Sequence, residues 1–321
     1  GDLIGKIEAD FAGSNSQGSL TTNGNGALRV RHAYLSLNKW LVGQTTSPFV
    51  NNDTAPETVD FNGPMGYSSQ RNVQVRYTQP TFKNQQVLVA LEGGDADNIS
   101  STTSTTLSDG SSVKTSGGNR LPALTVRYDI ATADKKGLLQ LHGLVHENRI
   151  SVATTSANLE EEKLGWGVGI GAKYNLTPAD TLFANYYHVK GDSKYQLYTN
   201  SAYVASRTGS ELSILESEFN SALVGYSHKW SPKWRSTIAA GAIWYNDDNA
   251  YAKYAKENDT SGALNKKLYN VIVNSFYSPV KGVDIGAEYT YGQRETFYNS
   301  TAGQDNKGDY SRVNLLARYS F

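Results

Sequence analysis

The end of the chain, residues 310–321, alternates between two kinds of side chain. Successive residues of a β-strand point to opposite faces, so every second position shares a face. One face carries Ser311, Val313, Leu315, Ala317, Tyr319 and Phe321, and the other carries Tyr310, Arg312, Asn314, Leu316, Arg318 and Ser320. The first face is almost entirely apolar, the second holds two arginines, and the stretch ends on an aromatic residue. This pattern is typical of the closing strand of a bacterial outer-membrane β-barrel.

The same alternation recurs from the beginning of the chain to its end. Stretches rich in Gly, Ser, Asn, Thr or Pro separate the alternating segments, and such stretches favour turns and loops. About fourteen strands are expected on this pattern, over residues 2–11, 28–34, 40–44, 72–77, 86–91, 124–130, 138–146, 166–174, 181–190, 219–228, 236–245, 269–277, 283–291 and 310–321. Long connections, which alternate with short turns, are expected at residues 12–25, 45–70, 93–119, 148–162, 191–213, 246–267 and 294–308.

The sorting of the connections into long and short ones indicates a particular kind of β-protein. In bacterial outer-membrane barrels the periplasmic turns are short and the extracellular loops are long. An even number of strands then places both termini on the periplasmic side. We therefore expect an all-β fold, a transmembrane antiparallel β-barrel that forms one domain over residues 1–321. A large soluble all-β protein is the alternative, but it gives no reason for this sorting of loop lengths.

The composition is compatible with a barrel and excludes several other classes. The 30 basic and 30 acidic residues cancel, so no basic excess points to nucleic acid, and we expect no nucleic-acid partner. No stretch approaches the roughly 20 apolar residues of a membrane helix. The 21 tyrosines and 30 glycines suit an apolar outer face, a polar lumen and aromatic girdles. We interpret the tryptophans as girdle residues: Trp40, Trp166, Trp230, Trp234 and Trp244.

Two further features of the composition concern chemistry and processing. The chain contains no cysteine, which removes disulfides, thiol catalysis and cysteine-based metal sites. Its only methionine is Met65, and no charged and apolar leader precedes Gly1. We therefore expect that the chain is a processed or trimmed product.

Several stretches near the beginning of the chain resemble one family of proteins. They are residues 5–11 (GKIEADF), 29–37 (RVRHAYLSL), 42–49 (VGQTTSPF), 55–66 (APETVDFNGPMG) and 73–77 (VQVRY). These stretches are similar to the DcaP-like trimeric porins of the Gram-negative outer membrane, which belong to the general bacterial porins. The resemblance implies a sixteen-stranded, trimeric diffusion channel, in which two strands and any coiled-coil extension precede the segment that begins at Gly1. It also implies that Tyr319 and Phe321 act as a signal for membrane insertion.

The connection at residues 45–70 is too rich in proline and glycine to be a strand. If two strands precede Gly1, this connection is the one that folds into the barrel and narrows it in general porins. Its members Pro48, Pro56, Gly63, Pro64 and Gly66 are consistent with such a compact, ordered constriction loop. The alternative is a barrel that closes with the strands present, in which this connection is an ordinary outer loop.

Charged residues of the strands should face the lumen, because a charge that faces lipid near the midplane costs about 2–4 kcal/mol. The candidate pore residues, including three carboxylates of the 45–70 connection, are Lys6, Glu8, Arg29, Arg31, Arg71, Arg76, Arg127, Asp53, Glu57 and Asp60. The other charged residues expected in the lumen are Asp10, Asp129, His142, His146, Lys173, His188, Lys190, Arg235, Asp284, Glu288, Arg312 and Arg318. On the strand at 28–34, the apolar face is expected to carry Leu28, Val30, His32 and Tyr34.

Four arginines flank the 45–70 connection in the sequence: Arg29, Arg31, Arg71 and Arg76. We expect them to form the basic side of a constriction, opposite the loop carboxylates. Opposite charges across a narrow gap create a transverse field, and excess positive charge attracts anions. A guanidinium donates two parallel hydrogen bonds to a carboxylate, so the expected solutes are small, hydrophilic and preferably anionic. The alternative is that these arginines pair with nearby carboxylates and pin the loop, and the two roles are compatible.

An outer-membrane β-barrel enzyme that acts on lipid or peptide is the alternative from another class. Neither a Gly-x-Ser-x-Gly nor a His-Glu-x-x-His motif occurs in the chain. His142 and His146 share a strand face but lie about 13 Å apart, too far to bind one metal ion. Residues 246–249 could bind calcium or be solvated, but EF-hand spacing is absent. We expect no catalysis, metal or cofactor, and the expected partners are outer-membrane lipid or lipopolysaccharide, small anionic solutes and two further copies in a homotrimer.

Overall fold

The computed structural model describes residues 1–13, 27–93, 104–106, 112–114, 120–153, 158–208, 211–298 and 305–321. Its dominant element is one antiparallel 14-stranded sheet, and the expected all-β fold is confirmed. In chain order, which is also their spatial order, the strands are β1 (Leu3–Gly13), β2 (Ala27–Leu37), β3 (Trp40–Thr46), β4 (Arg71–Pro80), β5 (Gln85–Glu92), β8 (Ala123–Ala131), β9 (Gly137–Ala153), β10 (Asn158–Asn175), β11 (Asp180–Lys190), β14 (Glu218–Ser231), β15 (Trp234–Tyr245), β16 (Asn265–Tyr277), β17 (Val283–Thr296) and β18 (Lys307–Tyr319). The connection between β3 and β4 therefore covers residues 47–70 rather than 45–70.

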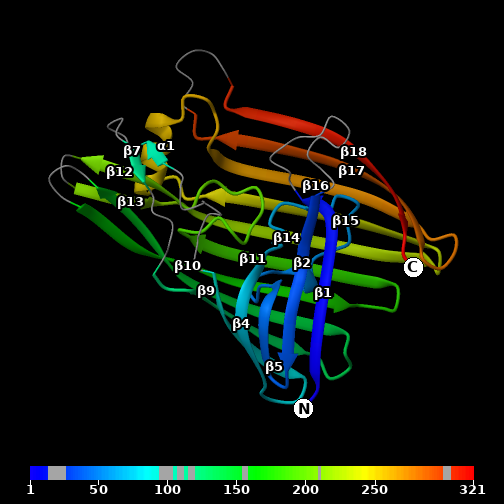
Figure 1. Cartoon of the computed structure of the whole chain (residues 1–321). Coiled ribbons are helices and arrows are strands. Elements are labelled where there is room, and N and C mark those ends of the chain that lie inside the picture. Colours follow the sequence, from blue (N-terminus) through cyan, green and yellow to red (C-terminus); the bar gives the residue numbers. More distant parts are fainter. Residues whose placement is uncertain are drawn as a thin grey trace.

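The sheet curls strongly, and β1 and β2 pass in front of β14 to β16 in the view of Figure 1. β1 and β18 are the two ends of the strand order, and they pair with β2 and β17, respectively. Short turns, such as the one between β2 and β3, join the strands at one end of the sheet, and long connections join them at the other. Both chain termini lie at the end with the short turns (Figure 1).

The sequence predicts a loop over residues 148–162, and this prediction is wrong. β9 and β10 continue through most of this range and pair with one another. Charged residues of this range form cross-strand ion pairs, such as Arg149 Nη2 with Glu160 Oε1 at 2.7 Å. Residues 154–157 lie outside the described residues.

Other long connections contain small regular elements. The connection after β11 holds a hairpin of β12 (Tyr203–Thr208) and β13 (Glu211–Glu216), and the one before β16 holds α1 (Ala250–Asn258). A 3-10 turn, η1 (Asn52–Thr54), follows β3, and β6 (Ser104–Thr106) pairs with β7 (Ser112–Lys114). Most of the 93–119 connection lies outside the described residues. Where the structure describes helices, none is long and apolar enough to cross a membrane.

The two faces of the sheet differ in exposure, as the alternation predicts. In β16, Val271 and Val273 are 39% and 49% exposed, whereas the intervening Ile272 is fully buried. The buried face also carries polar residues, such as Asn270 and Asn274, which point into the enclosed space. An apolar outer face and a partly polar inner face are the arrangement of a barrel in a membrane.

β2 departs from simple alternation at Arg31. The register of β1 and β2 pairs Glu8 with His32 and the next residue, Ala9, with Val30, so Arg31 is an extra residue on its strand. Such a β-bulge reverses the faces that follow it. The prediction that His32 and Tyr34 face lipid is therefore wrong, because both lie on the inner face.

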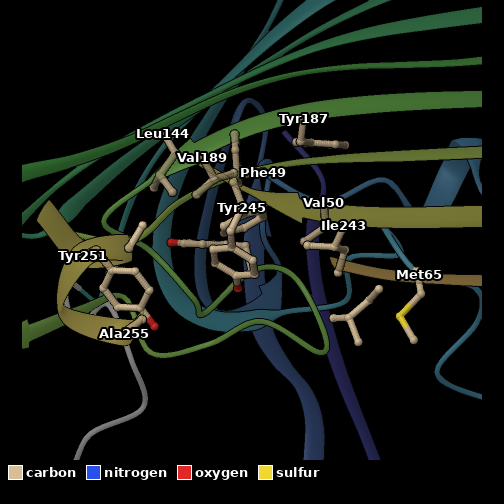
Figure 2. Packing of buried hydrophobic residues seen from close by; sticks show 14 of the residues in the cluster. Phe49, Val50, Met65, Leu144, Tyr187, Val189, Ile243, Tyr245, Tyr251 and Ala255 are labelled. Atoms are coloured by element: carbon tan, nitrogen blue, oxygen red, sulfur yellow. The ribbon is translucent and has the colours of Figure 1, made fainter. Parts of the chain in front are cut away.

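The apolar core lies on the inner side of the sheet, where two connections fold inward. We name residues 47–70 the inward loop and residues 191–202 the second loop. The Phe49 ring centroid of the inward loop lies 5.4 Å from that of Tyr187 on β11 and 5.5 Å from that of Tyr195 on the second loop. All three side chains are at most 2% exposed. Figure 2 shows the wider cluster, in which Tyr251 of α1 also takes part.

Candidate functional site

The inward loop crosses the inner face of the sheet. Near its start, the Pro48 carbonyl lies 2.8 Å from Nδ1 of His142 on β9. Thr54 Oγ1 then donates to Asn185 Oδ1 on β11 at 2.7 Å, and Asn185 Nδ2 donates back to the Thr54 carbonyl at 2.8 Å. These contacts confirm that this connection folds inward, and that it narrows the channel stays a prediction.

One buried carboxylate holds the middle of the inward loop. Glu288 on β17 is 2% exposed and accepts hydrogen bonds from Val59 N at 2.7 Å and from Asp60 N at 2.9 Å. Asn274 Nδ2 also donates to Glu288, at 3.1 Å. A buried carboxylate is costly unless its oxygens are satisfied. The loop backbone therefore supplies two of the donors that make Glu288 tolerable on the inner wall.

Glycines on the inner wall make room for the inward loop. A Cβ atom at Gly241 on β15 would lie 1.9 Å from the Met65 carbonyl oxygen, and one at Gly171 on β10 would lie 2.5 Å from Thr54 Oγ1. Both distances are below van der Waals contact, and at Gly241 the overlap is with loop backbone, so glycine is required where the loop approaches this strand. Next to Gly241, Met65 N donates to Asn270 Oδ1 on β16 at 2.9 Å and fixes the loop at this point.

Each of the three carboxylates predicted on the inward loop pairs with an arginine of the inner wall. The pairs are Asp53 with Arg127 on β8 at 3.2 Å, Glu57 with Arg235 on β15 at 2.7 Å, and Asp60 with Arg312 on β18. The structure thus brings Arg127, a predicted pore residue, together with the loop. These arginines hold the loop, but none of them is one of the four that flank it in sequence, which the alternative named.

A second charged group lies on the inner face of β1 and β2. Its ion pairs are Arg29 with Asp10 at 2.6 Å, Arg31 with Glu8 at 2.9 Å and with Asp10 at 3.0 Å, and Lys6 with Glu8 at 2.9 Å. The Arg31 guanidinium also lies 5.5 Å from the ring centroid of Phe61 on the inward loop. This group therefore borders the inward loop from the other side of the enclosed space.

Arg71 and Arg76 differ from the other predicted pore arginines. The Nε of each is buried without a hydrogen-bond partner, and neither forms an ion pair with a described residue. Arg76 shares the inner face with Gln74, and the charge of Arg127 acts on it. Arg71 begins β4 and shares the opposite face with the exposed Val73. The charges of Arg31 and Arg29 act on Arg71, whereas that of Arg127 acts on Arg76, so a single basic wall made of the four flanking arginines stays a prediction.

The second loop is a feature that the alternation gave no reason to expect. The Tyr195 hydroxyl donates to Glu92 Oε2 at the end of β5 at 3.0 Å, and Asn72 Nδ2 donates to the same oxygen at 2.6 Å. An isolated β-bridge joins Ser68 of the inward loop to Gln196 of the second loop. The available signal was Glu92 itself, a carboxylate on an inner-face position that required a partner.

Tyr195→Phe is expected to lower the free energy of unfolding by about 1–3 kcal/mol, because it removes a donor from a buried carboxylate. Burial and the charge of Glu92 raise the pKa of Tyr195 far above its usual range, so the hydroxyl remains a donor at neutral pH. The measurement is urea unfolding in lipid vesicles. Tyr174→Phe is the control, since Tyr174 is 44% exposed on the outer face. Equal losses in the two variants would contradict the role of Tyr195.

The prediction that His188 and Lys190 face the lumen is wrong. The inner face of β11 carries Asn185, which contacts the inward loop, and Tyr187 and Val189, which are at most 1% exposed. His188 and Lys190 occupy the alternate positions and point outward. The reason is that the inward loop brings apolar side chains, such as Phe49, to this part of the inner wall. The inner face of β11 is therefore apolar here, and its polar residues lie on the outer face.

The two histidines of β9 have separate roles. His142 contacts the inward loop, and His146 Nε2 lies 3.2 Å from Asp192 Oδ2 on the second loop. No group of three or more metal-ligating residues is found in the described part of the chain. In the 246–249 segment, Asn249 caps α1 by accepting a hydrogen bond from Ala252 N at 2.8 Å.

Tyr319 and Phe321 lie at the end of the chain beside the short turns. Tyr319 is 67% exposed, Phe321 is fully exposed, and their ring centroids are 6.0 Å apart. Both aromatic side chains are therefore accessible. Their use as an insertion signal stays a prediction.

A curled antiparallel sheet with an apolar outer face, long and short connections at opposite ends, and a loop that folds inward defines a porin-type channel. The chain belongs to the DcaP outer membrane protein family, whose model matches residues 1–321. It is 35% identical to the outer membrane channel DcaP of Acinetobacter baumannii, with a TM-score of 0.79 over 99% of this chain and 80% of that chain. The resemblance noted near the beginning of the sequence thus extends over the whole chain, and the protein is an integral outer-membrane channel.

Two more distant structures share the fold alone. OmpT of Vibrio cholerae is 11% identical, with a TM-score of 0.52 over 91% of this chain and 80% of that chain. OmpF of Salmonella typhi, in complex with daunomycin, is 12% identical, with a TM-score of 0.50 over 98% of this chain and 85% of that chain. No curated protein matches the sequence. The family and the DcaP structure describe an outer-membrane protein and channel, which does not favour the enzyme alternative.

Proposed function

We propose that the protein is a passive diffusion channel for small hydrophilic solutes and that it prefers anions with carboxylates. The observation that supports this preference is the charge balance beside the inward loop. The carboxylates of the loop, Asp53, Glu57 and Asp60, are each paired with a wall arginine. Arg76 faces the same enclosed space without an ion pair to any described residue.

Other carboxylates of the inner face pair with cations other than Arg76: Asp129 with Arg127, Asp284 with Arg235 and Arg318, and Glu8 and Asp10 with the cations of β1 and β2. Glu92 and Glu288 are each 2% exposed and are satisfied by hydrogen bonds within the protein. A fixed positive charge in a narrow opening with low-dielectric walls raises the local concentration of anions. The excess charge therefore favours anions over cations of the same size.

The geometry of arginine favours carboxylates among the possible anions. A guanidinium presents a planar fork of donors that matches the two oxygens of a carboxylate. Among the described residues, the head group of Arg76 makes only a long contact of 3.5 Å, from Nη1 to the Thr46 carbonyl. Its other terminal donors form no hydrogen bond with a described residue, which leaves them for a solute.

The test is the reversal potential of the reconstituted channel in a planar bilayer under a salt gradient. The unaltered protein is expected to show stepwise conductance with a reversal potential on the anion side. Arg76→Gln is expected to shift the reversal potential towards cations, and the double variant with Arg29→Gln is expected to shift it further, because each change removes positive charge from the inner face.

Lys135→Gln is the matched control. Lys135 is an exposed cation in the short turn between β8 and β9. Its loss is expected to leave the reversal potential unchanged. A cation-side potential in the unaltered protein, or equal shifts for Arg76→Gln and Lys135→Gln, would exclude the proposed preference, and a closed barrel would exclude the channel itself.

We further propose that the functional unit is a homotrimer. The resemblance of the first strands to trimeric porins supports this assembly. The mass of the protein extracted in mild detergent, measured by light scattering, is expected to equal three chains plus detergent. A mass of one chain would contradict it.

A further inference from the structure

One residue of the second loop has an unusual backbone conformation. Tyr198 has a φ angle of 66°, in the left-handed region that bulky L-amino acids rarely adopt. The other non-glycine residues with positive φ in the described part of the chain are Asn38, Asn84 and Lys135, and each lies in a short turn between two strands. A bulky aromatic side chain is strained in this conformation, so the surrounding structure must hold it there.

Hydrogen bonds on both sides of Tyr198 fix its backbone. The Tyr198 carbonyl accepts from Asn265 Nδ2, at the start of β16, at 3.1 Å. Asn200 Nδ2 donates to the Asn265 carbonyl at 2.8 Å, and Asn265 N donates back to Asn200 Oδ1 at 2.8 Å. On the other side, Leu197 N donates to the Tyr67 carbonyl of the inward loop at 3.4 Å. The second loop is therefore anchored to the wall and to the inward loop around Tyr198.

The Tyr198 side chain extends to the inward loop. We name residues 60–63 of the inward loop the tip. The side chain of Asn62 and the charges of Asp60 and Arg312 act on the Tyr198 hydroxyl. Asp60 and Arg312 are themselves paired where the tip meets β18. The hydroxyl therefore lies at the junction of the tip and the wall.

The Tyr198 ring is not packed into the apolar core. Tyr198 is 38% exposed, whereas Tyr195 on the same loop is 2% exposed. Phe61 of the tip is 67% exposed, and the Arg31 guanidinium on the inner face of β2 lies 5.5 Å from its ring centroid. Two aromatic side chains therefore border the enclosed space beside the tip.

We propose that Tyr198 determines the size of the solutes that pass the channel. Its ring occupies part of the passage beside the tip, and the diameter of a narrow passage limits which solutes enter. The second loop is one of the long connections, which lie at the extracellular end of such barrels. A solute from outside therefore meets Tyr198 as it approaches the tip. Because the backbone is anchored on both sides, the ring cannot move away with the loop.

The strained backbone favours this role over a purely structural one. Glycine adopts positive φ without strain and keeps its backbone hydrogen-bonding groups, so it would preserve the path of the second loop. The bulky side chain of Tyr198 is therefore not needed for the backbone conformation. What it adds is the ring beside the tip.

Liposome swelling with the full chain in vesicles tests the proposal. The measured quantity is the entry rate of a neutral disaccharide divided by that of a neutral pentose. Tyr198→Gly removes the ring and is expected to raise this ratio severalfold. Tyr198→Asn is a second variant of this kind, because asparagine also tolerates positive φ. Tyr198→Trp is expected to lower the ratio, and Tyr198→Phe, which keeps the ring, is expected to leave it near the unaltered value.

Asn84→Gly is the matched control, because it places glycine at an exposed position of positive φ in a short turn. It is expected to keep the unaltered ratio. Equal ratios for the unaltered protein, Tyr198→Gly and Tyr198→Trp would overturn the proposal. So would an equal rise in Tyr198→Phe and Tyr198→Gly, which would assign the effect to the hydroxyl, or a noisy single-channel conductance in Tyr198→Gly, which would indicate a released loop. The sugars carry no charge, so a failure of the proposed anion preference leaves this result unaffected.

Discussion

Gly241→Ala is expected to push the inward loop away from β15 and into the lumen. The added Cβ atom would lie 1.9 Å from the Met65 carbonyl oxygen, 2.7 Å from the Met65 carbonyl carbon and 2.8 Å from its nitrogen. These are backbone atoms, so no side-chain rotation relieves the overlap. β15 is held by hydrogen bonds to strands on both sides, and the loop is the part that moves. The single-channel conductance should therefore fall.

The same substitution should also cost stability. Overpacking a well-packed interior typically costs about 1–3 kcal/mol. Gly143→Ala on β9 is the control, because a Cβ atom there meets nothing within 4 Å. The measurements are conductance in planar bilayers and urea unfolding in vesicles. If both substitutions leave the conductance unchanged, the inward loop does not line the narrowest part of the channel.

Glu288→Ala is expected to act in the opposite direction and to release the middle of the inward loop. Without the carboxylate, Val59 N and Asp60 N lose their buried acceptor. Each unsatisfied donor costs about 1–3 kcal/mol while it stays buried, and release into water removes that cost. The ion pairs of Glu57 and Asp60 with the wall are partly exposed and hold the loop more weakly. Conductance should rise and become noisier.

Glu288→Gln removes the negative charge of the side chain but keeps its shape, so it tests the two contributions separately. The amide keeps one acceptor oxygen, so this variant is expected to fall between Glu288→Ala and the unaltered protein. Glu295→Gln is the control, because Glu295 lies on the same strand but pairs outside the lumen, with Lys266 at 3.2 Å. A steady, unaltered conductance in Glu288→Ala would show that the remaining contacts suffice to hold the loop.

The fold could be predicted from the sequence because a membrane requires every strand to alternate apolar outward positions with inward positions that can be polar. Outward positions must be apolar, so a two-residue rhythm appears wherever a strand crosses lipid. In β16 and β18 this rhythm predicts both the strand and its faces, and Arg312 and Arg318 lie on the inner side as expected. This alternation involves only neighbouring residues of one strand, so it can be recognised without knowledge of the rest of the molecule.

The errors arise where the environment of a residue is set by distant parts of the chain. Tyr187 and Val189 are apolar on the inner face because Phe49 covers that region, and this reversed the faces of β11. One bulged residue, Arg31, reversed the second half of β2. The loop expected at residues 148–162 consists mostly of two paired strands, because β9 and β10 continue through this range and pair with one another.

In the candidate site, too, the residue types could be predicted from the sequence, whereas the contacts between distant residues could not. Residue types alone suggested that arginines and the carboxylates of the inward loop lie close together, and the pair of Arg127 with Asp53 realises this. Proximity in sequence did not identify the partners, because Glu57 pairs with Arg235 and not with the arginines that flank the loop. Arg29 and Arg31 pair with β1 instead. The register between strands decides these choices, and composition does not determine register.

The inward loop also has a consequence for the assembly of the channel. Val59 and Glu288 are 229 positions apart in the chain, and Asp60 and Arg312 are 252 positions apart. Contacts between such distant residues form only after the intervening chain is in place. The loop is synthesised before the strands β17 and β18 that anchor it. The permeability of the channel is therefore set only when the C-terminal strands join the sheet.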